Sequence, residues 1–199
     1  MAVSAKQFDQ LVKRVAGKSS KDDDASQSPA ARKHQIIIGI DPSLRGTGYG
    51  VIQQVSEQAE ALNHGTIKCP TSWKVSRCLA HIHESLREVI LKHQPTACAI
   101  EGLFYAQNYR TALVMGEARG AAMVAAASFG LDIFELAPRK VKLAIVGYGN
   151  AQKIAVAKMV QRMLKLEEVP QADAADALAL ALAFSQESRR RIGTLPKQI

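Results

Sequence analysis

Apolar residues follow two alternating patterns along the chain, one typical of strands and one typical of helices. Short apolar runs predict strands at residues 36–41, 47–54, 61–67, 96–101 and 131–137. Apolar residues at helical spacing predict helices at residues 75–90, 109–128, 138–146, 150–165 and 172–188. Tight turns join the first three strands and helices precede the last two, which indicates an α/β protein with a mixed five-stranded sheet flanked by helices.

The two ends of the chain differ from this central region. Phe8, Leu11, Val12 and Val15 recur at helical spacing and predict a short amphipathic helix. Residues 17–34 are polar and rich in Ser and Asp, a composition that buries too little apolar surface to offset its ordering entropy. We therefore expect three parts. They are an N-terminal extension at 1–34 with a flexible linker, a folded domain at 35–188, and a loose basic tail at 189–199.

The charge balance points to a polyanionic partner. The 199 residues carry a formal net charge of +8. Residues 1–34 hold seven Lys or Arg against four Asp, and the remainder holds 19 against 14 acidic residues, so the main domain is itself basic. Such a balance favours nucleic acid as the partner. A basic protein without such a partner remains compatible with charge alone.

Membrane association and export are not indicated. No apolar run is long enough to cross a membrane, and the first residues lack the apolar core of an export signal. We therefore expect a cytoplasmic protein without disulfides. The three cysteines lack metal-ligand spacing and are typical of small buried side chains.

Four acidic residues occupy positions where a shared site can form. Asp41 and Glu101 each end an apolar strand, and parallel central strands would bring both carboxylates to one edge of the sheet. Asp173 and Asp176 lie three residues apart and therefore on one helix face. Carboxylates that repel one another need cations, and hard oxygen ligands suit Mg²⁺ or Mn²⁺.

Two structural alternatives stay open for these acids. The helix pair could complement the helix dipole or cap the helix start. Asp41 and Glu101 could instead form buried ion pairs with Arg45 or Arg119.

Five segments together resemble a known family. They are IIIGIDPSLRGTGYGVI, AIEGLFYAQN, EARGAAMVAAA, APRKVKLAIVGYGNAQK and PQADAADALALALA. In this order and spacing they are similar to the RuvC family of Holliday junction resolvases, and the match covers residues 35–185. The resemblance implies an RNase H-like fold and an endonuclease that resolves four-way DNA junctions by paired symmetric nicks in recombination and repair. One departure is Ser43-Leu44 after Asp41-Pro42, where the family usually has Gly-Ser.

The resemblance also implies residue roles. The metal ligands would be Asp41, Glu101, Asp173 and Asp176, holding two Mg²⁺ ions that Mn²⁺ could replace. Lys153 would assist at the nucleophile or phosphate, Lys142 would lie on the DNA path, and Phe104 would stack on an unpaired base. Basic residues expected to contact phosphates are Arg110, Arg139 and Lys140.

The resemblance also bears on the assembly of the protein and on the alternative functions that stay open. The family is homodimeric, and the small-residue helix around MGEARGAAMVAAA could pack against a second copy or against its own sheet. RuvA and RuvB are possible partners. Two alternatives remain: an RNase H-like nuclease of the YqgF type that acts on RNA, and a catalytically silent junction-binding protein.

Overall fold

The computed structural model describes residues 35–102, 108–189 and 196–199. The expected N-terminal helix and linker, and Phe104, lie outside these residues. The sheet strands are β1 (Ile36–Asp41), β2 (Gly46–Val55), β3 (Gln58–Lys68), β4 (Ala97–Glu101), β5 (Asp132–Leu136) and β6 (Lys197–Gln198). They are arranged in the order β3-β2-β1-β4-β5-β6. β1, β2 and β3 are antiparallel neighbours, and β4 and β5 are added in parallel to β1, which makes the mixed sheet that the sequence predicted.

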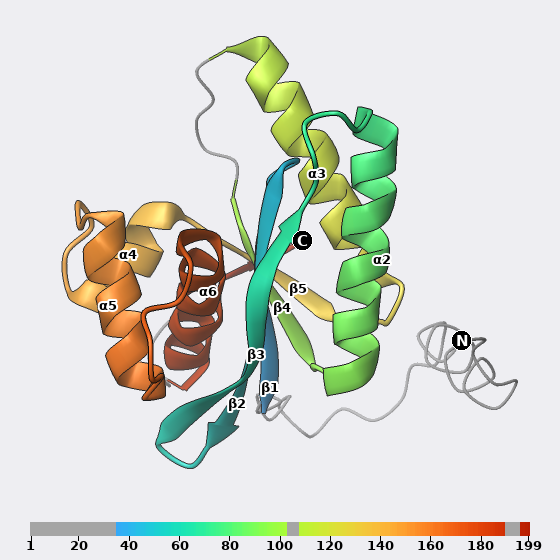
Figure 1. Ribbon diagram of the computed structural model, residues 1–199. Helices are drawn as coiled ribbons and strands as arrows, with labels where there is room; N and C mark the ends of the chain where they lie inside the picture. The colour runs from blue at the N-terminus through green and yellow to red at the C-terminus, as the bar shows by residue number, and fades with distance from the viewer. Residues whose placement is uncertain (1–34, 103–107, 190–195) are drawn as a thin grey trace, which may run out of the picture.

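Helices cover both faces of this sheet (Figure 1). On one face lie α2 (Val75–His93) and α3 (Tyr109–Ala127). On the other lie α4 (Pro138–Val146), α5 (Lys153–Leu164) and α6 (Ala172–Arg189). Each face has its own core of buried apolar side chains. Among the described residues, no helix is both long and apolar enough to span a membrane.

The alternation of side chains along the central strands decides which face receives the acids. In β1, Ile38 and Ile40 pack in the core under α2 and α3, so Asp41 points to the α6 face. In β4, Cys98 and Ile100 pack under α2 and α3, which directs Glu101 to the α6 face as well. Both strand-end carboxylates therefore lie on the same side of the sheet.

Three glycines allow α6 to lie directly on β1 and β2. A Cβ atom added at Gly39 would stand 1.9 Å from the carbonyl oxygen of Ala177, and one at Gly48 would stand 2.0 Å from that of Asp173. At Gly50 the added atom would stand 2.6 Å from the side chain of Leu178. Any larger side chain on this track would push the helix away. The close approach explains why the buried surface of α6 is so rich in alanine.

The structure differs from the sequence prediction at the C-terminus. The sequence indicated five strands and a loose tail, whereas Lys197 and Gln198 form a sixth strand antiparallel to β5. The Ile199 N–H donates to the carbonyl of Ile133 at 3.0 Å, and the Gln198 amide donates to the Asp132 carboxylate at 3.1 Å. An edge strand presents unpaired backbone groups that attract such a segment. A two-residue strand has no periodicity by which sequence could reveal it.

Candidate active site

The two strand-end acids meet at the centre of the sheet. Ile40 and Ile100 are partners in the parallel β1–β4 pairing, and Asp41 and Glu101 are the residues that follow them. Their carboxyl groups share a hydrogen bond on the α6 face. The sequence predicted this meeting for two central strands that share a direction, and β1 and β4 are central and parallel.

The environment of Asp41 disfavours its negative charge. Burial raises the pKa of Asp41 from its ordinary value of 3.8 to about 8. The charge of Glu101, the hydrogen bond with Glu101 and the charge of Asp176 all act in the same direction, and only Lys153 opposes them. Without a bound cation, Asp41 therefore favours its protonated form at neutral pH.

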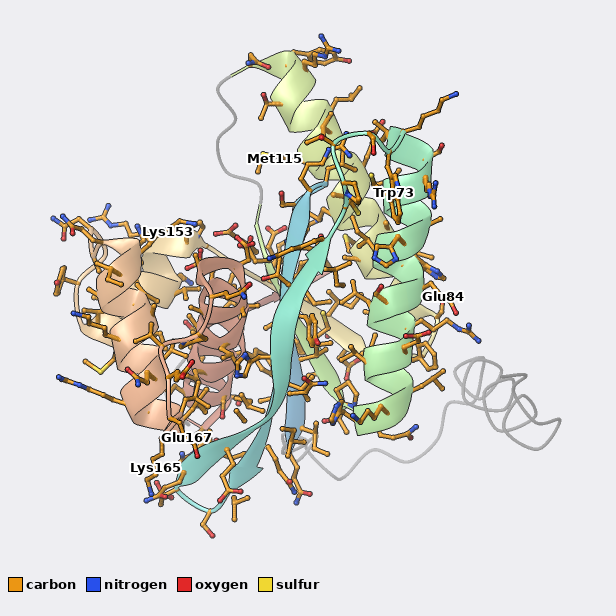
Figure 2. All side chains as sticks on the ribbon, in the orientation of Figure 1. Trp73, Glu84, Met115, Lys153, Lys165 and Glu167 are labelled. Atoms are coloured by element: carbon orange, nitrogen blue, oxygen red, sulfur yellow. The ribbon has the colours of Figure 1, made fainter. Side chains whose placement is uncertain are left out.

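Asp176 brings the third carboxylate to the site, from the first two turns of α6. Its Oδ2 atom accepts a hydrogen bond from Lys153 Nζ at 2.7 Å. The Lys153 side chain, labelled in Figure 2, begins α5 and is 71% exposed, whereas the Asp176 side chain is 23% exposed. The hydrogen bond to Asp176 raises the pKa of Lys153, and the charges of Asp176, Asp41 and Glu101 add to this effect against a partial desolvation. Lys153 is thus a cation that already faces the acidic group.

Asp173 lies one helical turn earlier, against the start of β2. Its Oδ2 atom would stand 3.0 Å from a Cβ added at Gly46, and the methyl group of Thr66 would stand 3.6 Å from the same atom. Thr66 Oγ1 is buried and has no hydrogen-bond partner in the described residues. Asp173 does not contribute to the pKa shift of Asp41. The helix pair predicted from sequence therefore contributes one close carboxylate and one at the margin of the site.

The donor set fits divalent cations by its chemistry. Within the described ranges, no three His, Cys, Asp or Glu side chains converge closely enough to hold a metal ion as they stand. The raised pKa of Asp41 and the ammonium of Lys153 both reduce the negative charge of the site. A divalent cation would relieve the same repulsion that forces the proton onto Asp41, and all the available donors are hard carboxylate oxygens. We conclude that the residues present suit Mg²⁺ or Mn²⁺.

The turn after Asp41 tolerates Ser43 where the family has glycine. The hydroxyl of Thr47 donates to the Ser43 carbonyl at 2.6 Å and accepts from the Ser43 N–H at 3.2 Å. Ser43 is not among the described residues with positive φ, so this turn has no need of glycine. Leu44 is buried in the core under α2.

The structural alternatives for the acids are less consistent with the observed contacts. Arg45 donates to the Pro70 carbonyl at 2.6 Å and to the Trp73 carbonyl at 3.2 Å. Arg119 forms its ion pair with Glu135, a residue that sequence reasoning did not single out. The carboxylate of Asp176 reaches across to Lys153 on a different helix, so it is engaged outside its own helix start.

The remaining predicted basic residues lie at the starts of α3 and α4 and are exposed or half-buried. Arg139 and Lys140 are exposed in the first turn of α4, and Lys142 is half-buried in the next turn. Arg110 is exposed at the start of α3. None of these four residues contributes to the pKa shift of Asp41 or of Lys153.

Comparison with known proteins gives a consistent family assignment. Residues 37–184 match the family model described as crossover junction endodeoxyribonuclease RuvC. The RuvC of Pasteurella multocida is 50% identical over 150 residues, which cover 75% of this chain and 78% of that protein. The RuvC of Akkermansia muciniphila is 46% identical over 146 residues, which cover 73% and 87%.

A solved structure supports the fold as well as the family. It is described as T. thermophilus RuvC in complex with Holliday junction substrate, is 32% identical, and superposes with a TM-score of 0.77 over 83% of this chain and 100% of that one. The mixed sheet with helices on both faces is accordingly the RNase H-like fold that the sequence predicted. This chain belongs to the RuvC family of crossover junction endodeoxyribonucleases.

Proposed function

We propose that this protein resolves Holliday junctions by paired symmetric nicks, through metal-assisted hydrolysis of phosphodiester bonds at Asp41, Glu101, Asp173 and Asp176. The observation that carries the proposal is the shared hydrogen bond of Asp41 and Glu101 at the ends of adjacent parallel strands, with Asp176 close enough to raise the pKa of Asp41. The T. thermophilus relative described with a Holliday junction substrate supports the choice of DNA.

Each acid has a distinct place in the proposed site. Asp41, at the end of the central strand β1, would help to hold the two Mg²⁺ ions, with Mn²⁺ able to replace them. Glu101 would hold one ion, and Asp173 with Asp176 would hold the other. Bound divalent cations supply positive charge that activates water and stabilises the attacking and leaving oxygens of an in-line displacement.

Lys153 supplies a mobile positive charge beside the acids. Its side chain is 71% exposed, so it is free to turn from Asp176 to a phosphate oxygen of bound DNA. An ammonium placed there would stabilise the negative charge that develops on the phosphate during cleavage. As the resemblance to the family implies, hydrolysis would leave a 5′-phosphate and a 3′-hydroxyl.

Basic residues around the site would hold the DNA. Arg139, Lys140, Lys142 and Arg110 would contact phosphates, which makes junction binding weaken as salt increases. Phe104, in the segment after β4, would stack on an unpaired base at the junction.

A homodimer would place two such sites symmetrically about the two-fold axis of a junction. One face of α3 packs on its own sheet through Ala118, Ala122 and Ala125. On another face, a Cβ atom added at Gly116 or Gly120 would meet nothing within 4 Å. Leu113 and Val124 share that face and are 50% and 56% exposed. This second face, which we call the outer α3 face, would pack against a second copy. Partnership with RuvA and RuvB stays a prediction.

The decisive experiment separates binding from chemistry at the four acids. Asp41→Asn, Glu101→Gln, Asp173→Asn and Asp176→Asn keep nearly the same shape, so folding should survive. Nicking of a synthetic four-way junction in Mg²⁺ should fall by about 10²-fold or more, the size expected for losing a preorganised electrostatic contact. Junction affinity in EDTA should hold or rise, because the variants repel DNA phosphates less.

Parallel substrates distinguish the alternatives. Linear duplex DNA and structured RNA are incubated beside the junction under the same conditions. Preferential cutting of RNA would favour the YqgF-type reading, and tight junction binding without nicking would favour a silent binding protein. If any two of the four variants still nicked the junction, the two-metal assignment would be wrong.

A further inference from the structure

The end of β4 is held from the opposite side of the sheet by a polar group that plays no part in the proposed chemistry. Arg119 lies in the middle of α3, on the face that carries neither Asp41 nor α6. Its Nε donates to the backbone carbonyl of Glu101 at 3.2 Å. One terminal nitrogen donates to Glu135 Oε2 at 2.5 Å, and the other lies 3.0 Å from Met123 Sδ. The guanidinium thus uses all three nitrogens.

These contacts fix one particular peptide group. The carbonyl of Glu101 and the N–H of Gly102 belong to the same planar unit. Arg119 holds the carbonyl, and the N–H donates to the Leu136 carbonyl of β5 at 3.0 Å. With both ends of this peptide held, the backbone torsion that follows the Glu101 Cα atom is fixed. The direction in which its carboxylate leaves the strand is fixed with it.

Glu135 keeps the guanidinium in place. In β5, Ile133 packs in the core under α2 and α3, so Glu135, two residues later, faces α3 as well. The side chains of Arg119 and Glu135 are only 14% and 22% exposed, so water screens their ion pair weakly. A planar guanidinium with five N–H donors can serve a carboxylate and a carbonyl together, whereas a single ammonium cannot do so at fixed geometry.

A contribution to stability does not explain the ion pair of Arg119 with Glu135. Mostly buried ion pairs contribute little, since desolvation offsets their attraction, and apolar side chains of similar volume often serve as well. The pair instead stands directly behind the residue whose carboxylate hydrogen-bonds Asp41. We propose that Arg119, held by Glu135, is a positioning residue that orients Glu101 for catalysis by fixing the Glu101–Gly102 peptide from the far side of the sheet.

The test compares two conservative variants that affect different bonds. Arg119→Lys can still face Glu135 but loses the Nε donor to the Glu101 carbonyl. Glu135→Gln removes the charge from the partner but leaves that donor in place. Arg87→Lys is the matched control, because Arg87 pairs with Glu84 on α2 at greater exposure, and Glu84 projects from the outer side of that helix in Figure 2.

Four quantities are measured on each protein: single-turnover nicking rate at saturating junction, junction Kd in EDTA, melting temperature, and Mn²⁺ binding to the DNA-free protein by electron paramagnetic resonance. We expect Arg119→Lys to nick about tenfold or more slowly and to bind Mn²⁺ more weakly, as is usual when a group that orients a ligand is changed. Its junction Kd should stay within about twofold of wild type, because the DNA contacts are untouched. Glu135→Gln should reduce the nicking rate and the Mn²⁺ affinity less than Arg119→Lys does. Arg87→Lys should match wild type in both.

Two results would overturn the positioning role. One is an Arg119→Lys rate within twofold of wild type. The other is a slower rate that disappears once the unfolded fraction, read from the melting curve, is allowed for. The inference rests on the proposed function, and Glu101→Gln separates the two. If Glu101→Gln still nicks the junction, the site assignment itself fails. If it is inactive while Arg119→Lys is normal, only the positioning role fails.

Discussion

Asp41 is the residue at which stability and function oppose each other. Its pKa is raised from 3.8 to about 8 in the folded protein, chiefly by burial. The folded state therefore binds a proton that the unfolded state has lost between these two pH values. Stability should fall as pH rises through this window and then level off above about 8. This cost is what a bound divalent cation would remove.

The first prediction follows from that sign. Asp41→Asn carries no charge at any pH, so in EDTA at pH 8 we expect it to melt at a higher temperature than wild type while failing to nick junctions. Near pH 4 the two melting temperatures should converge. Calorimetry from pH 4 to 9 checks this, with exposed Glu168→Gln as the control. The same pH dependence in Asp41→Asn and wild type would show that ionisation of Asp41 does not cause the loss of stability at high pH.

Replacement of Lys153 should change activity but have little effect on stability. An ion pair this exposed contributes about 0–1 kcal/mol, so Lys153→Gln should leave the free energy of unfolding nearly unchanged. Nicking should fall, because the positive charge available to the phosphate is lost. Lys158→Gln, an exposed lysine on the same helix, is the control. Equal nicking by the two variants would assign Lys153 a surface role only.

At the scale of elements, the contact between α6 and the glycines of β1 and β2 sets the position of the site. Asp176 reaches Lys153 and the strand-end acids only because the helix lies within backbone contact of the sheet. At Gly39 and Gly48 the helix meets the sheet through the backbone carbonyls of Ala177 and Asp173, so no side chain can adjust the fit there. Small changes in this contact should therefore move two of the four acids together.

A pair of glycine substitutions tests this contact. The Cβ of Gly39→Ala would meet the Ala177 carbonyl, which is backbone and cannot move without the helix. The Cβ of Gly46→Ala would meet only the side chains of Asp173 and Thr66. We expect Gly39→Ala to cost about 3 kcal/mol or more of unfolding free energy, the upper end for overpacked cores, and Gly46→Ala clearly less. Denaturant unfolding gives both values. Equal costs would mean that α6 shifts freely.

At the scale of the whole molecule, the sheet separates the acidic site from the surface that we propose contacts a second copy. The acids and Lys153 lie on the α6 face of the sheet. On the opposite face, Arg119 of α3 points toward the sheet, and the outer α3 face points away from it. A second copy bound to the outer α3 face would leave the acidic site of each copy open to DNA. This arrangement suits a two-fold symmetric substrate.

Gly120→Leu tests the assembly without disturbing the fold. Nothing lies within 4 Å of an added Cβ at Gly120, and leucine favours helix over glycine by up to about 1 kcal/mol. We expect a monomer in sedimentation equilibrium and single unpaired nicks in a junction for this variant, and a dimer with paired nicks for wild type. Glu88→Leu on α2 serves as the control for an added surface leucine. A dimeric Gly120→Leu protein would place the interface elsewhere.

The sequence by itself determined strands β1 to β5, the mixed character of the sheet and the strand ends at which Asp41 and Glu101 stand. Local periodicity encodes an element, and a short turn or a helical crossover encodes the direction of the next strand. The spacing of Asp173 and Asp176 likewise gave one helix face. The five quoted segments identified the family and, with it, the expected use of these acids.

Only the tertiary structure decided which groups face one another across elements. The close seat of α6 on Gly39 and Gly48, the different surroundings of Asp173 and Asp176, and the contact of Arg119 with Glu101 and Glu135 all join residues far apart in the chain. A two-residue strand such as β6 has no pattern to recognise. Such contacts depend on how two surfaces fit and on the distances between their charges. The order of residues along one element contains neither quantity.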